Sequence, residues 1–481
     1  MKIFHYLSQH ANKFSFGYVI AIAMILAGCG GGSSATPPVT LSSIAITPDP
    51  VAIGINKTLS LTATGTYSNG STADLTSRVT WTIANTAIAS VGSSTGVATG
   101  VALGITAITA TMSGITSPAV TVTVTVGGST SFGRLNIASY EHTATLLLNG
   151  NVLVAGGFGT TGPLTTGPLN SAELFDPATN IWTLTGNLGT ARNDHTATLI
   201  TSGPASGKVL VLGGLDNNAT DLSSGELYDP VTKMWSQLLG ILQKARSYHT
   251  ATLLTTGKVL LVGGAGLTDI NELYDPNNPA ASAVAATPDT SLTGRYSHTA
   301  TLLANSSVLV AGGFDGTTAL NTAELYDAAG AGLGATTGLM TIGRYLHSAT
   351  LLANGKVLVV GGIDTASHEL ATAELYDPVA KTWSAAASLA TARFGHTATL
   401  MPDGKVLVMG GSNASNPNLS SAELYDPNLN TWSPTGNLQT GRHVYSATLL
   451  PASAVPAISG QVLVVGGIGD AGTLSSVELH N

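Results

Sequence analysis

Residues 127–481 repeat one phrase seven times, and this repetition constrains the fold more than any other feature of the sequence. A representative copy, "GHTATLMPDGKVLVMGG", ends at Gly411. The phrase starts at His142, His195, His249, His298, His347, His396 and Tyr445, in steps of 53, 54, 49, 49, 49 and 49 residues. A unit of this length cannot bury both faces of its own strands, so the copies must pack against one another.

Each copy has the pattern of four short strands. After "HTATLL" comes an apolar run, "KVLVxGG", then a variable polar stretch, the phrase "AELYDP" and a turn into a last segment. The glycine pairs are 156–157, 213–214, 263–264, 312–313, 361–362, 410–411 and 466–467. Four copies place a tryptophan seven residues after the aromatic residue of "AELYDP": Trp182, Trp235, Trp383 and Trp432. The apolar run predicts a strand buried on both faces, and Asp-Pro predicts a turn.

The period, the glycine pair and the spaced Tyr and Trp resemble the kelch repeat. This resemblance implies a seven-bladed β-propeller over residues 127–481, with "HTATLL" as the innermost strand A and "KVLVxGG" as strand B. The chain ends at "SSVELHN", so the seventh unit lacks its outermost strand. We expect residues near 129–134 to supply that strand and close the ring.

The third and fourth units depart from the pattern. The third lacks the tryptophan and carries the insert "NNPAASAVAATPDTSLTG". In the fourth unit Leu333 stands at the tryptophan position and Ala328 at the proline position. We expect irregular outer strands in both units.

Residues 41–126 form a different unit. About seven short alternating segments separated by turn residues predict a β-sandwich. The "YSNGS" turn, Leu75-Thr76, Trp81 and "GVATGVALGITAITA" resemble the bacterial Ig-like domain of the Big-2 type. In such a domain Trp81 is expected in the core. The whole chain is therefore predicted to be all-β, with an Ig-like sandwich followed by the propeller.

The N-terminus has the features of a lipoprotein signal. Residues 1–28 carry Lys2 and Lys13 before a short apolar run, and "LAGC" ends at Cys29, the only cysteine of the chain. This motif resembles a bacterial lipobox, which implies cleavage before Cys29 and its lipidation. The alternative is an ordinary signal peptide or signal anchor. Gly30, in place of Asp, favours the outer membrane, and residues 29–40 read as a Gly/Ser/Pro tether.

Composition narrows the choice of partners. The net charge is −8, and only 9% of residues are charged. A nucleic-acid-binding surface needs a basic stripe, so we expect no nucleic-acid partner. We expect contact with the membrane only through the lipid anchor, and we expect no cofactor.

Two polar positions recur in nearly every copy. An arginine precedes the histidine by three residues at Arg192, Arg246, Arg295, Arg344, Arg393 and Arg442, while the first copy has Ser139. Strand C carries Glu173, Glu226, Glu272, Glu324, Glu374, Glu423 and Glu478. We interpret these residues as a structural Arg/His–Glu hydrogen-bond ladder that ties the blades together, because a group present in almost every blade is usually part of the scaffold. The alternative is a histidine ring that binds a metal or an anion.

Residues that depart from the repeat are better candidates for a binding site. Aromatic or histidine side chains lie around strand A on the face with the D–A and B–C loops: Tyr140, Tyr248, Tyr296, Tyr345, Phe394, His443 and Tyr445. They could stack on sugar rings or hold a protein loop, or they could simply pack between blades. The B–C loops also carry Asp216, Asp221, Asp269, Asp315 and Asp364, without the spacing of a calcium loop. Whether a metal binds is left open.

Three segments match nucleotide-binding or catalytic motifs, but none has the structural context that the motif requires. "GFGTTG" and "GIGDAG" each lead into a strand rather than a helix, and "GSSTG" lies in the Ig-like unit. Galactose oxidase combines a kelch propeller with a β-sandwich, but its copper radical site needs a cysteine joined to a tyrosine. Cys29 lies in the lipobox, so that chemistry is excluded. The kelch sialic-acid mutarotases need no cysteine.

These observations predict a lipid-anchored cell-envelope protein, at the outer membrane or cell surface. We expect its propeller to recognise a glycan or a protein through the loop face, as in adhesion. The alternatives are a mutarotase-like carbohydrate-active enzyme and a purely structural surface protein.

Overall fold

The computed structural model describes residues 39–47, 49, 51–54, 58–102, 104–125, 129–162, 165–238, 241–265, 271–278, 284–285, 294–332, 337–451 and 460–481. The predicted signal peptide, Cys29, tether residues 29–38 and Asp269 lie outside these ranges. The chain divides into two compact units, Met1–Gly128 and Ser129–Asn481. Within the described ranges, no helix has the length and apolar character needed to cross a membrane.

The first unit is a sandwich of short strands. One sheet pairs β1 (Leu41–Thr47), β4 (Thr62–Tyr67) and β5 (Thr72–Asp74). A second has the order β10 (Ile115–Thr116), β9 (Gly104–Met112), β11 (Val120–Thr125) and β2 (Val51–Gly54), with β6 (Thr80–Ile83) also on β9. A third joins β3 (Thr58–Ser60), β8 (Val97–Gly100) and β7 (Ala89–Val91). Trp81 is buried in this core, as predicted, and its indole Nε1 donates to the Thr76 carbonyl.

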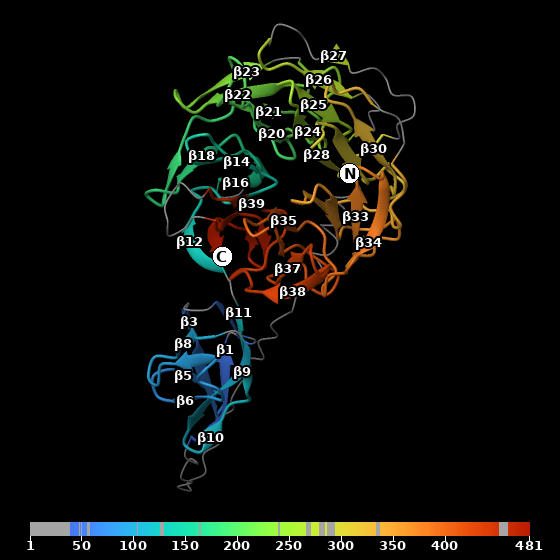
Figure 1. The fold of residues 1–481 in the computed structure, drawn as a ribbon. Helices are drawn as coiled ribbons and strands as arrows, with labels where there is room; N and C mark the ends of the chain where they lie inside the picture. The colour runs from blue at the N-terminus through green and yellow to red at the C-terminus, as the bar shows by residue number, and fades with distance from the viewer. Residues whose placement is uncertain are drawn as a thin grey trace, which may run out of the picture. The chain divides into compact units, whose positions relative to one another are not determined.

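The second unit is a ring of seven blades (Figure 1). Blades 1 and 2 contain β14 (Thr143–Leu146), β15 (Val152–Ala155), β18 (Ala172–Asp176) and β19 (Ile181–Leu184), then β20 (Thr196–Leu199), β21 (Val209–Leu212), β22 (Gly225–Asp229) and β23 (Met234–Leu238). Blades 3 and 4 contain β24 (Thr250–Leu253), β25 (Val259–Val262), β26 (Glu272–Tyr274) and β27 (Val284–Ala285), then β28 (Thr299–Leu302), β29 (Val308–Ala311) and β30 (Ala323–Tyr326).

Blades 5 and 6 contain β31 (Ser348–Leu351), β32 (Val357–Val360), β33 (Ala373–Asp377) and β34 (Thr382–Ala386), then β35 (Thr397–Leu400), β36 (Val406–Met409), β37 (Ala422–Asp426) and β38 (Thr431–Thr435). Blade 7 contains β39 (Ser446–Leu449), β40 (Val462–Val465) and β43 (Ser476–His480). In every blade strand A is innermost, and strand A of each blade contacts strand A of the next, from β14 round to β39 and back. All these ladders are antiparallel.

The ring closes as the sequence predicted. Strand β12 (Ser129–Arg134) is the outermost strand of blade 7 and pairs antiparallel with β43, so that Ser129 lies opposite His480. The Ser129 hydroxyl and the His480 imidazole lie 3.1 Å apart at this junction. Pairing removes the free edge that β43 would otherwise expose.

The third and fourth blades are the irregular ones. In blade 3 the outer strand β27 has two residues, and the described part of blade 4 has three strands, β28, β29 and β30. An isolated bridge from Tyr326 to Gly332 replaces regular pairing beyond β30. The prediction for these two units is confirmed.

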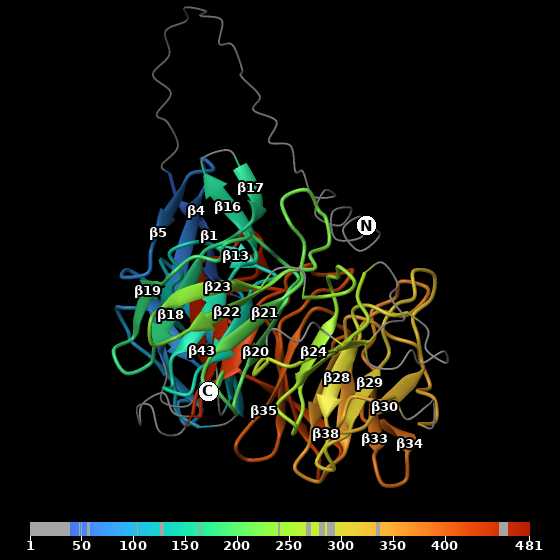
Figure 2. The ribbon, with the colours of Figure 1, turned by 90° about the horizontal axis from the view of Figure 1, so that it is seen from above.

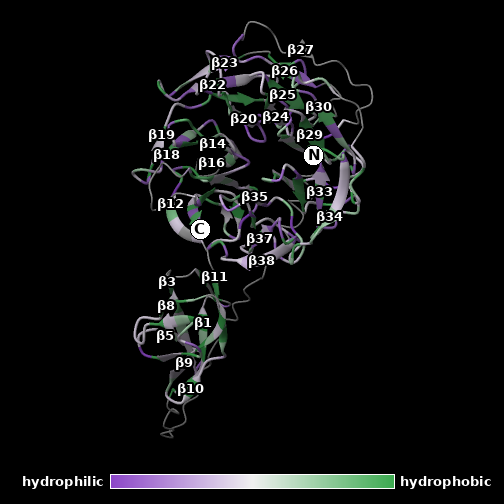
Figure 3. Cartoon of the chain, in the orientation of Figure 1, coloured by the Kyte–Doolittle hydropathy of each residue, from purple (hydrophilic) through white to green (hydrophobic). Residues whose placement is uncertain are grey.

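Strand B shows why the repeat needs neighbours. In blade 2, Val209 and Val211 pack against blade 1, whereas Leu210 and Leu212 pack against blade 3. Both faces of the strand are buried, which explains its continuous apolar run (Figure 3). The same packing continues where the ring closes between blades 7 and 1: Leu463 and Val465 of blade 7 contact Phe175 of blade 1.

Candidate functional site

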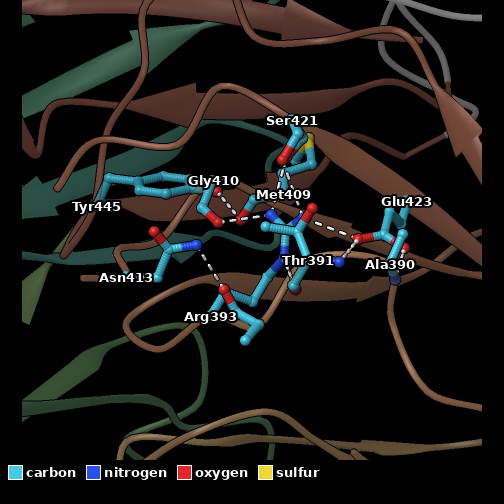
Figure 4. A network of polar contacts seen from close by, with 10 residues as sticks. Ala390, Thr391, Arg393, Met409, Gly410, Asn413, Ser421, Glu423 and Tyr445 are labelled. Carbon is cyan, nitrogen blue, oxygen red and sulfur yellow. Dashed lines mark hydrogen bonds and ion pairs between the residues drawn. The ribbon is translucent and has the colours of Figure 1, made fainter. Parts of the chain in front are cut away.

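A buried ion pair joins the segment before strand A to strand C in six blades of the described structure. In blade 6 the Arg393 guanidinium lies 2.9 Å from the Glu423 carboxylate and also donates to the Gly410 carbonyl (Figure 4). The carboxylate accepts two further bonds, from the backbone N–H groups of Ala390 and Thr391. The glutamate therefore fixes the segment that arrives from the preceding blade, which is a structural role.

Blade 1 keeps the glutamate but has no arginine. Glu173 accepts from the backbone and side chain of Asn136 and from the backbone of Ile137. Ser139, at the arginine position, lies 3.1 Å from His142 Nδ1. In blade 1 an asparagine thus replaces the arginine as the side-chain hydrogen-bond donor to the glutamate. These bonds hold the loop between β12 and strand A against strand C.

The repeat histidines belong to a second set of contacts, which link the blades. The first hydroxyl residue of each strand A meets the histidine of the next blade; Thr250 Oγ1 and His298 Nε2, for example, are 2.8 Å apart. The other members are Thr143–His195, Thr196–His249, Thr299–His347, Ser348–His396, Thr397–Tyr445 and Ser446–His142. We call this closed set the hydroxyl–histidine ring. Burial lowers the pKa of His298 to about 3, so its imidazole is neutral.

A second ring, made by the backbone, lies on the face that carries the B–C loops. It consists of the residue before each repeat histidine: Glu141, Asp194, Tyr248, Ser297, Leu346, Gly395 and Val444. All seven have positive φ, between 51° and 59°. The N–H group of each donates to the carbonyl of its equivalent in the preceding blade, and Glu141 closes the circle on Val444. We call these residues the axial ring.

The axial ring is regular in backbone but asymmetric in chemistry. Blades 1 to 4 contribute Glu141, Asp194, Tyr248 and Ser297, whose side chains are all polar. Blades 5 to 7 contribute Leu346, Gly395 and Val444. All seven residues are partly exposed. A repeat that keeps its scaffold but varies at one exposed position is a means of recognising an asymmetric ligand.

Two carboxyl groups meet on the polar side of this ring. The Asn193 amide nitrogen donates to Glu141 Oε2 at 2.9 Å and to Asp194 Oδ2 at 2.7 Å. A single nitrogen of Asn193 therefore bonds both carboxyl groups. Burial raises the pKa of Glu141 to about 7, although the bonds from Asn193 and Asp194 oppose this effect. The pKa of Asp194 is raised by burial and then by the Glu141 charge.

Three of the predicted site residues are partly exposed: Tyr140, Tyr248 and Tyr296. The charges of Glu141 and Asp194 act on Tyr140 and Tyr248. The rings of Tyr248 and Tyr296 are 6.4 Å apart, and Tyr140 packs on Phe158 at 5.4 Å. Tyr296 continues through Phe314 to Tyr345. The ring contacts of Tyr248, Tyr296, Phe314 and Tyr345 therefore run through blades 3 to 5, whereas Tyr140 packs within blade 1.

The other four predicted residues are buried: Tyr345, Phe394, His443 and Tyr445 are 8%, 3%, 7% and 9% exposed. Tyr445 occupies the histidine position of the hydroxyl–histidine ring and donates to the Met409 carbonyl at 2.6 Å. His443 is bonded to Asn418, which in turn bonds Asp470. Since these side chains fill the space between blades, we leave them out of the candidate site.

The loop aspartates within the described residues bond their own or a neighbouring loop. Asp216 accepts from the backbone of Asn218 and Thr220, and Asp315 accepts from Thr317 and Thr318 in the same way. Asp364 accepts from the His368 backbone, and Asp221 accepts from the Ser247 hydroxyl. In the part of the chain that the structure describes, no group of three or more His, Cys, Asp or Glu residues is arranged to hold a metal.

Sequence reasoning missed Glu141, Asp194 and Asn193. An alignment of the seven copies distinguishes the two acidic residues, because only the first two copies have an acid directly before the repeat histidine. The aromatic residues and the longer loops depart from the repeat more visibly than these acids do. The separation of 52 residues between Glu141 and Asn193 hides their contact from any local motif.

Comparisons with known proteins agree with this architecture. Family models match the chain as "Bacterial Ig-like domain (group 2)" over residues 40–127 and as "Kelch motif" over 142–189 and 203–238. A third, the "KLHDC2/KLHL20/DRC7 Kelch-repeats domain", matches residues 248–467. Ice-binding protein 1 of Shewanella frigidimarina (strain NCIMB 400) is 50% identical over 54 residues, which are 11% of this chain and 6% of that protein. The chain thus spans a small fraction of that relative's length.

A solved structure shares the fold. It is described as a "Novel fungal alcohol oxidase with catalytic diversity among the AA5 family, in complex with copper", with a TM-score of 0.54 and 19% identity. The match covers 73% of this chain and 75% of that one. At this identity the likeness concerns the fold alone. Kelch repeats together with a bacterial Ig-like domain indicate a binding or structural protein of the bacterial surface. The chain is a kelch-repeat protein in which a group 2 bacterial Ig-like domain precedes a seven-bladed β-propeller.

Proposed function

We propose that this protein is a lipid-anchored envelope protein that recognises a glycan on the loop face of its propeller. Cys29 carries the lipid, the tether and the Ig-like unit act as a spacer, and the polar side of the axial ring contacts the ligand. The asymmetry of this ring is the observation that carries the proposal. A purely structural ring would have no reason to place its acids and exposed tyrosines in neighbouring blades.

The chemistry of that side suits a sugar. Tyr140, Tyr248 and Tyr296 offer partly exposed rings, on whose faces the C–H groups of a sugar can stack. Glu141 and Asp194 offer oxygens that accept bonds from sugar hydroxyls. Apolar rings beside a few convergent polar groups are typical of small-ligand sites.

The test is a glycan array probed with the chain from Gly30 onward, in calcium and in EDTA. A saturable signal that falls at least tenfold in Tyr248→Ala and Tyr296→Ala supports the proposal. Leu429→Ala is the matched control, because Leu429 is 71% exposed and lies between β37 and β38, outside the axial ring. Loss of signal in EDTA would add a metal to the site. Silence across the array would reject the glycan and leave a protein partner or a structural role.

Anchoring is tested separately. Cells expressing the chain are fed an alkyne-bearing fatty acid, and the protein is recovered from membrane and soluble fractions. Label and membrane association should both disappear in Cys29→Ala. Equal labelling of this variant would reject the lipid anchor without affecting the glycan proposal.

A mutarotase-like enzyme is the second candidate, and the acid pair is what favours it. Acid–base catalysis uses one carboxyl group that holds a proton near neutral pH and a second group that can accept a proton. Proton exchange at a free anomeric centre requires such a proton donor and acceptor. NMR would detect faster anomer exchange, and Asp194→Asn should abolish this acceleration.

A further inference from the structure

An ion pair recurs on the face opposite to the axial ring, where the A–B and C–D turns lie. A lysine directly before strand B approaches the aspartate of the Asp-Pro turn after strand C. In blade 5, Lys356 Nζ and Asp377 Oδ2 are 3.1 Å apart. The other members are Lys208–Asp229 at 3.1 Å and Lys405–Asp426 at 3.8 Å. Asp377 Oδ1 meanwhile accepts from the backbone of Val379 and Ala380. One carboxylate oxygen therefore holds the turn, and the other binds the ammonium group.

Blade 1 keeps the aspartate but has no lysine at this position. Asn151 precedes strand B, in "NGNVLV" where blade 5 has "NGKVLV". Asp176 Oδ1 accepts from the Ala178 backbone, as in the other turns, and Oδ2 accepts from the Thr179 hydroxyl at 3.0 Å. Within the described residues, no ion pair involves Asp176. The carboxylate thus has a neutral donor where three other blades supply a cation.

A cavity lies beside Asp176. Its volume is about 450 Å³, and its walls are the A–B turn and the Asp-Pro turn of blade 1, together with Pro451 of blade 7. Blade 5 has a cavity at the equivalent place, but its volume is about 290 Å³ and Lys356 forms part of its lining. Ser307 replaces the lysine in blade 4 as well. In blade 1, however, the aspartate without a cation adjoins the larger of these two cavities.

The lining of the blade 1 cavity suits a lysine side chain. Pro451 and Leu148, which is 64% exposed, offer apolar surface along which the methylene groups of a lysine can lie. Asp176 offers a carboxylate to the ammonium group at the end of that stem. The side-chain amides of Asn149 and Asn151 can bond the backbone of the segment that carries the lysine. The net charge of −8 favours a basic partner over an acidic one.

We propose that the cavity beside Asp176 is a socket for a lysine side chain of a partner protein, which takes the place that Lys356 occupies in blade 5. The socket lies on the opposite face from the axial ring, so a partner protein and a glycan can bind the same propeller together. The two proposals concern different faces and different ligands, and each can fail without the other.

The experiment follows the amide NMR signals of the chain from Gly30 onward. The probe is a five-residue peptide with a central lysine between alanines and with blocked ends, and its control carries norleucine in place of lysine. A half-exposed ion pair is weak, so we expect a millimolar dissociation constant. The lysine peptide should shift the signals of Asn149, Asn151 and Ala178 saturably, and the norleucine peptide should leave them in place. Equal shifts with both peptides, or no shift with either, would overturn the proposal.

A substitution that fills the socket from within tests the role of Asp176. Asn151→Lys supplies the lysine of blades 2, 5 and 6, so the peptide should no longer shift the signals of blade 1. Asn151→Gln is the matched control, because its side chain stays neutral, and it should bind as wild type does. Unchanged binding in Asn151→Lys would contradict the socket. Shifts with butylammonium equal to those with the peptide would reject a protein segment as the occupant.

The reverse substitution should create a second socket. Lys356→Asn removes the cation from Asp377 in blade 5, so the lysine peptide should now also shift the signals of Asn354 and Val379, which line that cavity. The signals of blade 1 should respond as in wild type. Silence in blade 5 would contradict the inference that an aspartate without its lysine, beside a cavity of this shape, binds a lysine from outside.

Discussion

His142 Nε2 and the Ser446 hydroxyl lie 2.8 Å apart, although 304 positions separate the two residues in the chain. This contact completes the hydroxyl–histidine ring by joining strand A of blade 7 to blade 1. The axial ring closes between the same two blades, through the backbone of Glu141 and Val444. Blades 7 and 1 are thus held together by two inner rings and by apolar packing, while β12 completes blade 7 on the outside.

The closing strand should be essential for the stability of blade 7. Deletion of residues 129–134 uncovers the edge of β43 and leaves the apolar contacts of Leu479 and Val477 without their cover. We expect the melting temperature of the propeller to fall by more than 10 °C and the chain to aggregate, as measured by calorimetry and light scattering. Deletion of residues 39–125, which keeps β12, is the control. An unchanged melting temperature in the first deletion would contradict the role of β12.

Removing one partner of the Arg393–Glu423 ion pair should lower the free energy of unfolding strongly. Arg393→Ala leaves a buried carboxylate without its guanidinium, a change that costs about 3–5 kcal/mol. Lys405→Ala removes an exposed partner of Asp426 in the same blade and should cost under about 1 kcal/mol. Chemical denaturation of both variants gives the comparison. Equal losses in the two variants would mean that burial does not set the strength of these pairs.

The first glycine of each pair should tolerate no side chain. A Cβ at Gly361 would lie 2.5 Å from the Arg393 carbonyl oxygen and 2.8 Å from His396 Cε1. Gly355, in the same blade, also has positive φ but has nothing within 4 Å of such a Cβ. Gly355→Ala should cost about 1–2 kcal/mol through backbone strain, and Gly361→Ala should cost clearly more. Similar unfolding free energies for the two variants would show that strain, and not close approach, explains the glycine pair.

The hydroxyl–histidine ring should make the fold sensitive to acid. His298 has a folded pKa of about 3, below its ordinary value, so the stability it contributes is present above about pH 6.5 and is lost as pH falls toward 3. The melting temperature of wild type should therefore decline below pH 6.5. His298→Tyr, which copies the seventh unit, should decline less steeply between pH 6.5 and pH 4. His368→Gln alters an exposed histidine and should follow wild type.

Much of the fold could be read from the sequence because the information is local and repeated. The glycine pair, the apolar run and "AELYDP" recur with a nearly constant period, so the number of blades and the order of their strands follow from counting. The absent last strand could be inferred because a missing element is visible against the earlier copies that have all four strands. The ion pair of Arg393 with Glu423 could likewise be expected, since both residues recur together.

The candidate site depended on the tertiary structure. Burial between blades removed Tyr345, Phe394, His443 and Tyr445 from the exposed surface, and no local pattern distinguishes them from Tyr248 or Tyr296. Glu141 and Asp194 approach the same Asn193 because packing of successive blades brings equivalent positions to one axis. The sequence by itself determined the blade and its repetition, whereas the packing of blade on blade decided which side chains face each other, because such contacts join residues about fifty positions apart.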